Sequence, residues 1–184
     1  MSFTGTVTLF GTAKADPHSS EYLAEQAAKG DEGCFVELCR LLENKLFRTA
    51  KGILGSEASA LDAVSEAVFR AYKGIKKLRN PKFVETWFIR IVLNAANDIR
   101  RKQKREITME AVPEGLHYDN HDELEFYRMI EMLQIELREV ISLKYYSGYT
   151  LAETAAILKI PEGTAKSRLH RALELLRLEA ADEY

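Results

Sequence analysis

The feature that most constrains the fold is a stretch at residues 83–104 whose apolar side chains recur every three or four residues. Such spacing places them on one face of a long helix. That inner face consists of Val84, Trp87, Phe88, Ile91, Val92, Ala95 and Ile99. Strand signals are nearly absent, because only residues 6–10 look β-like. The chain is therefore predicted to be all-α.

The same periodicity predicts further helices before this stretch. One covers residues 20–28, and a second covers about residues 33–53, closed by Gly52 and Gly55. Ser56 can cap a third helix. Its predicted inner stripe is Leu61, Val64, Val68, Ala71 and Ile75, with Asp62, Ser65, Glu66 and Arg70 on the opposite side. The dipeptide Asn80-Pro81 then forces a turn.

Charge and hydropathy narrow the class of protein. The 184-residue chain is 46% hydrophobic and carries a net charge of −2, which argues against a coat of basic residues for nonspecific DNA compaction. No apolar run approaches the roughly 20 residues of a membrane span, so a cytoplasmic protein without membrane insertion is expected. Nevertheless, residues 100–105 hold five cations, more than the favourable interaction with a helix C-terminus requires.

A polar, aperiodic segment at about residues 108–120 divides the chain. We predict an N-terminal extension at 1–19, a helical domain at 20–105, a flexible linker at 106–121 and a second helical domain at 122–184. The second domain should contain helices at about 122–133 and 136–146. Thr150 can cap a helix over 151–158, and Thr164 can cap a last helix that runs to about Leu178.

The last two helices have the spacing of a helix-turn-helix, with Ala155 as the small residue where they cross. Packing would come from Leu151, Leu158, Ile160, Ala165 and Leu169. The outward face of the second helix would then present Thr164, Lys166, Ser167, Arg168, His170 and Arg171. These side chains suit phosphates and base edges in a major groove. An amphipathic helical hairpin with a solvated basic face is the alternative.

Three segments resemble the extracytoplasmic-function (ECF) family of RNA polymerase sigma factors. Residues 148–172, which read GYTLAETAAILKIPEGTAKSRLHRA, resemble region 4.2 of that family. Residues 61–72, LDAVSEAVFRAY, resemble region 2.2, and residues 87–101, WFIRIVLNAANDIRR, resemble regions 2.3 and 2.4. The resemblance covers about residues 20–105 and 122–180 in the family's order.

The resemblance implies a sigma factor that directs promoter-specific transcription initiation, without catalysis and without a cofactor or metal. Its partners would be promoter DNA and core RNA polymerase, through the clamp helices of the largest subunit and the flap of the second subunit. Matching positions in region 2.2 assign the clamp contact to Asp62, Glu66 and Arg70. An anti-sigma factor is also implied, with membrane anchorage of that partner as one alternative.

The resemblance also implies that region 4 reads the minus-35 element with the helix-turn-helix face, while region 2 melts and reads the minus-10 element. The loop at residues 78–83 would hold a flipped base. The minus-10 contacts expected in region 2 are Asn80, Asn94, Arg100, Arg101, Lys102, Lys104 and Arg105. Asp98 is expected to orient a neighbouring cation, and Trp87 is expected to pack in the core rather than stack on separated strands.

The sequence departs from the family pattern at several positions. Thr154, Lys159 and Ala165 replace the usual isoleucine, glycine and valine of the helix-turn-helix. A non-glycine residue at a left-handed helix end costs up to about 1 kcal/mol. Ser65 replaces a usual glutamine in region 2.2, and Gln134 replaces a usual proline.

Three other functions remain open from the residues. A metal enzyme would use His117, Asp119, His121, Asp122 and Glu123, although a solvated acidic linker is the favoured interpretation of that cluster. A stand-alone helix-turn-helix regulator would bind duplex DNA by itself, usually as a dimer. A DNA-free adaptor would use its helices only to bind proteins.

Overall fold

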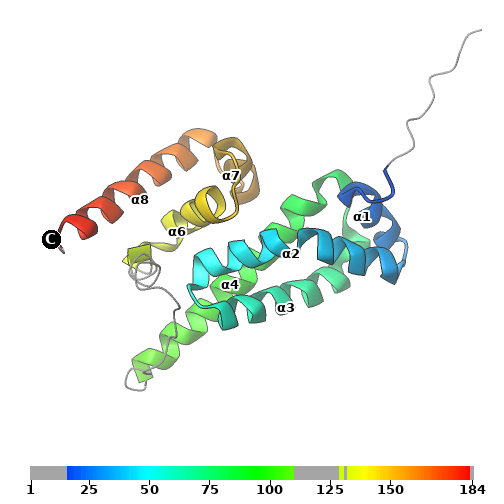
Figure 1. Ribbon diagram of the computed structural model, residues 1–184, viewed down its shortest axis with the longest axis horizontal. Helices are drawn as coiled ribbons and strands as arrows, with labels where there is room; N and C mark the ends of the chain where they lie inside the picture. The colour runs from blue at the N-terminus through cyan, green and yellow to red at the C-terminus, as the bar shows by residue number, and fades with distance from the viewer. Residues whose placement is uncertain (1–15, 110–128, 131, 183–184) are drawn as a thin grey trace, which may run out of the picture.

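The computed structural model describes residues 16–109, 129–130 and 132–182. Every regular element in these residues is helical, which confirms the predicted all-α class. The longer helices are α1 (Ser20–Ala28), α2 (Glu32–Leu54), α3 (Glu57–Gly74), α4 (Val84–Met109), α6 (Ile135–Ile141), α7 (Leu151–Leu158) and α8 (Glu162–Asp182). Figure 1 shows α1 to α4 as one bundle, with α6 to α8 beside it. No described helix is long and apolar enough to cross a membrane.

Side-chain caps explain where the first three helices begin. Ser19, Asp31 and Ser56 each accept a hydrogen bond from a backbone N–H in the first turn of α1, α2 and α3 respectively. The prediction that Ser56 is a cap is therefore confirmed. The end of α4 was predicted too early, because the helix continues past Lys104 to Met109.

The inner face of α3 differs from the prediction at Leu61, whose side chain is 58% exposed. The buried seam consists instead of alanines at 60, 63, 67 and 71, all 0% exposed, while Val64 and Val68 lie at its edge. Small side chains allow neighbouring helices to approach closely. The predicted stripe is thus confirmed at Ala71 and Ile75 and wrong at Leu61, because spacing alone favoured the larger residues over the alanines next to them.

The apolar surface of α4 is wider than the predicted stripe. Phe88 and Val92 are fully buried as expected, but Ile89, Leu93 and Ala96 are buried as well, on an adjoining face. A helix with so broad an apolar arc must pack against more than one neighbouring layer. In the structure α4 packs against α2 and α3, and also against α7 from the second half of the chain.

In the second half, residues 129, 130 and 132 are helical and precede α6, which continues without a break into the π-helical turn η3 (Ser142–Tyr146). Two hydrogen bonds between Thr150 and Glu153 form a capping box at the start of α7. The predicted cap at Thr164 is wrong, because α8 already begins at Glu162 and Thr164 lies inside its first turn. The N–H groups of Thr164 and Ala165 donate to the Pro161 carbonyl.

Two hydrophobic clusters are present in the described residues. The smaller one joins α6 and α8, with Leu137, Ile141, Ala172 and Leu176 at its centre. The larger one fills the α1–α4 bundle, but it also includes Leu143, Tyr149 and Ile157 from the second half. The second half therefore packs directly on the first through a shared apolar core.

Candidate nucleic-acid interface

The outward face of α8 carries the cations predicted from the helix-turn-helix pattern. Lys166, Ser167, His170 and Arg171 are exposed, and Thr164 and Arg168 are half-buried. Ala165 and Ala172 on the opposite face are 0% exposed and hold the helix against its neighbours. The six predicted residues thus lie together on one helix, where they can meet phosphates and base edges along a groove.

The turn before α8 depends on Lys159, which adopts the left-handed conformation with φ 56° and ψ 42°. Its backbone N–H and that of Ile160 close the end of α7 by hydrogen bonds to carbonyls of that helix. Ala155, the predicted crossing residue, is only 4% exposed. The angle between α7 and α8 is therefore fixed by close packing and by a strained turn residue.

Acidic groups of α6 lie beside the outward face of α8. A cavity of about 410 Å³ opens between α6 and α8, lined by Gln134, Glu136, Leu137, Thr164, Ser167, Arg168 and Arg171. Burial raises the pKa of the nearby Glu139 carboxyl, as does the charge of Glu136, whereas the hydrogen bond from Asn97 and the charge of Arg168 lower it. Arg168 therefore has an acidic neighbour within its own domain.

The second basic surface runs along the end of α4. Asn94, Arg101, Lys102, Lys104 and Arg105 are exposed, and Arg100 is half-buried. The expectation that Asp98 orients a cation is confirmed, because its carboxylate accepts hydrogen bonds from Arg101 and, at 3.0 Å, from Arg70. These hydrogen bonds, first that of Arg101, lower the pKa of Asp98.

Asn80 lies exposed in the loop between η1 (Ile75–Lys77) and η2 (Pro81–Phe83). Its side-chain oxygen accepts a hydrogen bond of 3.1 Å from the Lys82 N–H, so it caps the short helix η2. Sequence reasoning missed the cations that surround it. Lys76, Lys77, Arg79 and Lys82 are all exposed, and the Phe83 ring is 57% exposed beside them. An aromatic ring among cations is a common arrangement for single-stranded nucleic acid.

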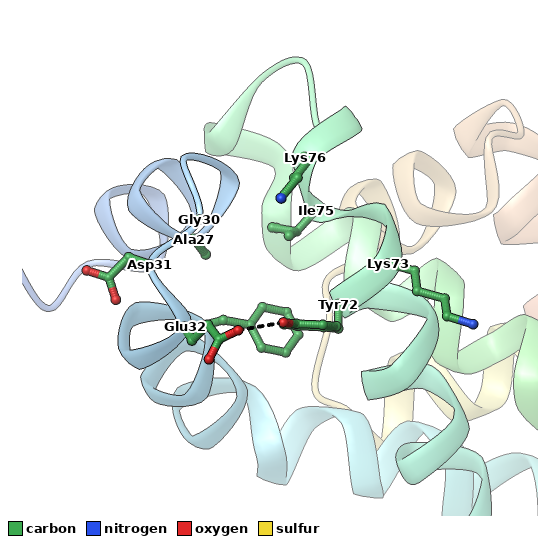
Figure 2. Close-up of a pocket in the computed structure, with 9 residues that line it drawn as sticks. Ala27, Gly30, Asp31, Glu32, Tyr72, Lys73, Ile75 and Lys76 are labelled. Carbon is green, nitrogen blue, oxygen red and sulfur yellow. Dashed lines mark hydrogen bonds between the residues drawn. The ribbon is translucent and has the colours of Figure 1, made fainter.

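A cavity of about 260 Å³ lies where the end of α1, the start of α2, the end of α3 and η1 meet. Figure 2 shows the Tyr72 hydroxyl directed at Glu32 across the cavity, and the two atoms are 2.8 Å apart. Lys73 and Lys76 lie at its edge. The Phe35 and Tyr72 rings meet edge to face, with centroids 5.3 Å apart, so the wall between α2 and α3 is aromatic.

The residues assigned to polymerase binding lie on the outer face of α3. Asp62 and Glu66 are exposed as predicted. Arg70 differs from them because it is half-buried between Glu66, at 2.7 Å, and Asp98 on α4, at 3.0 Å. It therefore links the α3 face to the basic end of α4.

The cluster considered for a metal site, His117 to Glu123, lies outside the described residues. Within the described part of the chain, no group of three or more histidine, cysteine, aspartate or glutamate residues has the arrangement needed to hold a metal ion.

Comparisons with known proteins agree with this geometry. Residues 38–106 match the family model "Sigma-70 region 2", and residues 123–176 match "Sigma-70, region 4". The ECF RNA polymerase sigma factor SigW of Bacillus subtilis is 31% identical over 177 residues, which cover 86% of this chain and 95% of SigW. The ECF sigma factor SigM of Mycobacterium tuberculosis is 32% identical over 158 residues, covering 84% of this chain and 80% of SigM.

A similar fold occurs in the solved complex of the sigma factor RpoE with the anti-sigma factor NepR from Bartonella quintana. Its TM-score is 0.61 at 25% identity, and the match covers 78% of this chain and 94% of that one. The basic residues on α4 and α8 thus lie within the two segments that match these family models. The chain belongs to the ECF family of RNA polymerase sigma factors and acts in transcription initiation.

Proposed function

We propose that this protein binds core RNA polymerase and places it at promoters that carry two separate sequence elements. In this proposal region 4 reads the minus-35 element through the outward face of α8, and region 2 melts and reads the minus-10 element through α4 and the loop before it. The observation that carries the proposal is the presence of two distinct basic surfaces, one on each domain. The domains are taken as residues 20–105 and 122–184.

The contact with polymerase is assigned to Asp62, Glu66 and Arg70 on the outer face of α3, by their match to region 2.2. Two exposed carboxylates on one helix face support the assignment, because electrostatic complementarity steers protein association. A charge reversal such as Glu66→Lys should weaken binding to core polymerase in a pull-down. Glu21→Lys, at an exposed position on α1, is the matched control and should leave binding unchanged.

The chain is further proposed to be a non-catalytic factor that works in the cytoplasm, where polymerase and promoter DNA are found. An anti-sigma factor is proposed as a regulator, supported by the likeness to RpoE, which was solved with its anti-sigma factor NepR.

Run-off transcription from a genomic promoter library, with core polymerase in the presence and absence of the protein, tests the proposed function. Initiation at a shared two-element promoter only when the protein is present is the expected result. The triple variant K166A/R168A/R171A should lose that initiation. Specific duplex binding by the protein alone, without any initiation, would instead favour a stand-alone regulator.

A further inference from the structure

An open groove runs between α2 and α3, which lie side by side in the bundle (Figure 1). Its volume is about 450 Å³, and its lining residues are Phe35, Val36, Cys39, Arg40, Glu43, Leu46, Val64 and Val68. Only Arg40 and Glu43 among them are charged, and both side chains are exposed. The inner wall of the groove is therefore apolar.

Exposed apolar side chains extend the groove along α3. One face of this helix, defined by steps of three and four residues, carries Leu61, Val64, Val68 and Tyr72. Leu61 is 58% exposed and Tyr72 48%, and Val36 across the groove on α2 is 48% exposed. Large apolar side chains that gather on one exposed surface mark a site of interaction. The groove thus has the character of a docking surface.

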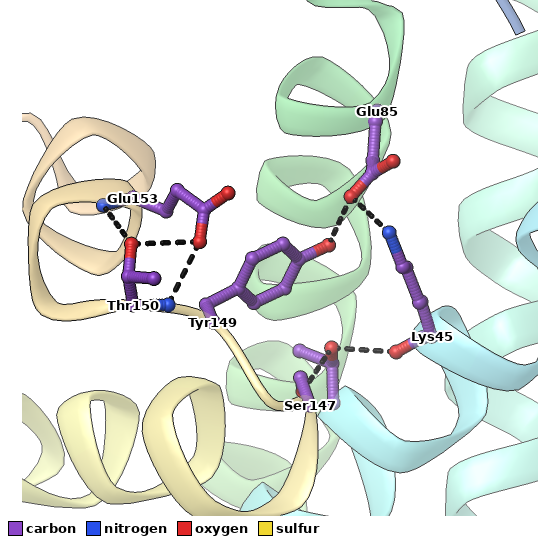
Figure 3. Close-up of polar contacts among 7 residues, drawn as sticks. Lys45, Glu85, Ser147, Tyr149, Thr150 and Glu153 are labelled. Atoms are coloured by element: carbon purple, nitrogen blue, oxygen red, sulfur yellow. Dashed lines mark hydrogen bonds and ion pairs between the residues drawn. The ribbon is translucent and has the colours of Figure 1, made fainter.

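The other sides of α2 already have partners. Leu38 and Leu42 are buried in the core of the bundle. Figure 3 shows Lys45 of α2 bound to Glu85 of α4 at 2.6 Å, and the Tyr149 hydroxyl donates to the same carboxylate at 2.8 Å. The groove side differs from these sides, because its apolar side chains face solvent.

The sequence of residues 1–15, which lie outside the described residues, has the pattern of an extended segment with one apolar face. Phe3, Val7 and Leu9 stand at odd positions, whereas positions 2, 4, 6 and 8 are serine or threonine. Such alternation is typical of an extended chain that buries one side. Lys14 is the only charged side chain among these residues. Segments that stay solvated are richer in charge and poorer in apolar residues, so this segment calls for an apolar partner.

The described chain begins close to the groove. The His18 Nδ1 lies 2.7 Å from the Glu37 carboxylate on α2. Val36 and Arg40 of the groove lie within one turn of Glu37, since a helix rises about 1.5 Å per residue. The nine residue steps from Leu9 to His18 span up to about 30 Å when extended. The apolar positions of the segment can therefore reach the groove without strain.

The dimensions and charge of the groove also suit this segment. The part of α2 from Val36 to Leu46 is about 15 Å long, and the stretch from Phe3 to Leu9 spans about 20 Å when extended. The two charged lining residues have opposite signs, so the groove offers no net charge to a charged partner. Within the described residues there is no strand with which an extended segment could pair. An apolar helix groove is thus the available partner.

We propose that residues 1–15 dock in the groove between α2 and α3, with their odd-numbered apolar side chains directed into it. The covalent link raises the effective concentration of the segment, so weak apolar contacts suffice to hold it there. Asp62 and Glu66, assigned to polymerase, lie on the other side of α3 and are not needed for this contact. The inference therefore stands apart from the proposed promoter function.

Cys39 provides a reporter, because its thiol lines the groove. The chain has two cysteines, so Cys34→Ser leaves Cys39 as the single thiol of the full-length protein. The rate at which a maleimide labels Cys39 then measures how far the groove is covered. Burial raises the pKa of the Cys39 thiol to about 11, so the variants are compared at one fixed pH and as ratios of rates.

The test variant in this background carries Val7→Asp and Leu9→Asp, which place two charges on the apolar side of the segment. The matched control carries Thr6→Asp and Thr8→Asp, which place the same charges on its polar side. The test variant should label Cys39 about tenfold faster than the parent if the docked form is about nine-tenths populated. The control should label like the parent, and circular dichroism should show equal helix content and equal thermal unfolding for all three proteins.

Four results would overturn the inference. Equal labelling of the parent and both variants would show that the segment does not cover the groove, and equal acceleration in both variants would show that its apolar face is not responsible. Protection that increases with protein concentration would identify a second copy as the occupant. Protection that arises only when core polymerase is added would assign the groove to polymerase. Run-off transcription tests the proposed function separately, and its failure would leave the labelling result unchanged.

Discussion

Two buried threonines should respond in opposite directions to the same substitution. Thr154 on α7 and Thr49 on α2 are both 0% exposed. The Thr154 hydroxyl makes no hydrogen bond within the described part of the chain. The Thr49 hydroxyl donates to the Lys45 carbonyl at 2.7 Å and meets the Ser147 hydroxyl at 2.8 Å. Valine has nearly the shape of threonine and replaces the hydroxyl with a methyl group, so the change isolates the polar atom.

Thr154→Val should stabilise region 4 by about 1–3 kcal/mol, because a buried donor without a partner costs that much in desolvation. Thr49→Val should destabilise the protein by roughly 0.5–1.5 kcal/mol for each hydrogen bond lost. Urea unfolding followed by far-UV circular dichroism measures both free energies of unfolding. The reasoning is refuted if Thr154→Val lowers the free energy of unfolding, or if both variants shift it in the same direction.

Three further predictions concern the turn, the DNA face and acid stability. Lys159→Gly should stabilise region 4 by up to about 1 kcal/mol in thermal unfolding, because glycine adopts the left-handed conformation without strain; a loss of stability would contradict this. Lys166→Ala and Arg171→Ala should each reduce the salt slope of DNA binding by about 0.9 if each contacts one phosphate, whereas unchanged slopes would remove them from the interface. The hydrogen bond from the Thr150 side chain, followed by that from its N–H, lowers the pKa of Glu153. The resulting stability is present above the ordinary carboxyl pKa of about 4.3 and disappears as the pH falls through the lowered, folded-state pKa. Glu153→Gln should remove this part of the acid dependence in unfolding measured at several pH values, and an unaltered pH profile would count against it.

The helix ends and turns were largely predictable from the sequence, because they depend on residues that are close together along the chain. Ser56, Thr150 and Lys159 occupy caps and turns where the chemistry of one side chain determines the backbone. The outward face of α8 was predictable for the same reason, because the spacing of its residues along the chain determines which side chains share a helix face. The start of α8 was misplaced by three residues because Thr164 has the chemistry of a cap, whereas the helix begins directly after Pro161.

The contacts between domains were not predictable from periodicity. Apolar spacing shows that Ile89 and Leu93 can be buried, but it does not show which distant segment covers them. Arg90 and Arg138 look like ordinary surface cations in the sequence, and only the docked structure reveals that their partners are carbonyls at helix ends. The exposure of Leu61 and the burial of the alanine seam on α3 were not predictable for the same reason. Both depend on how closely the neighbouring helices pack, which is a property of the tertiary structure.

We propose that the two domains read two promoter elements together while bound to one polymerase. Run-off transcription from a promoter with five base pairs inserted between the elements tests this coupled reading. The insertion lengthens the spacer by about 17 Å and turns the elements by about half a helical turn. Initiation should fall sharply, while binding of the protein to each isolated element is unchanged. Undiminished initiation from the lengthened promoter would contradict coupled reading by the two domains.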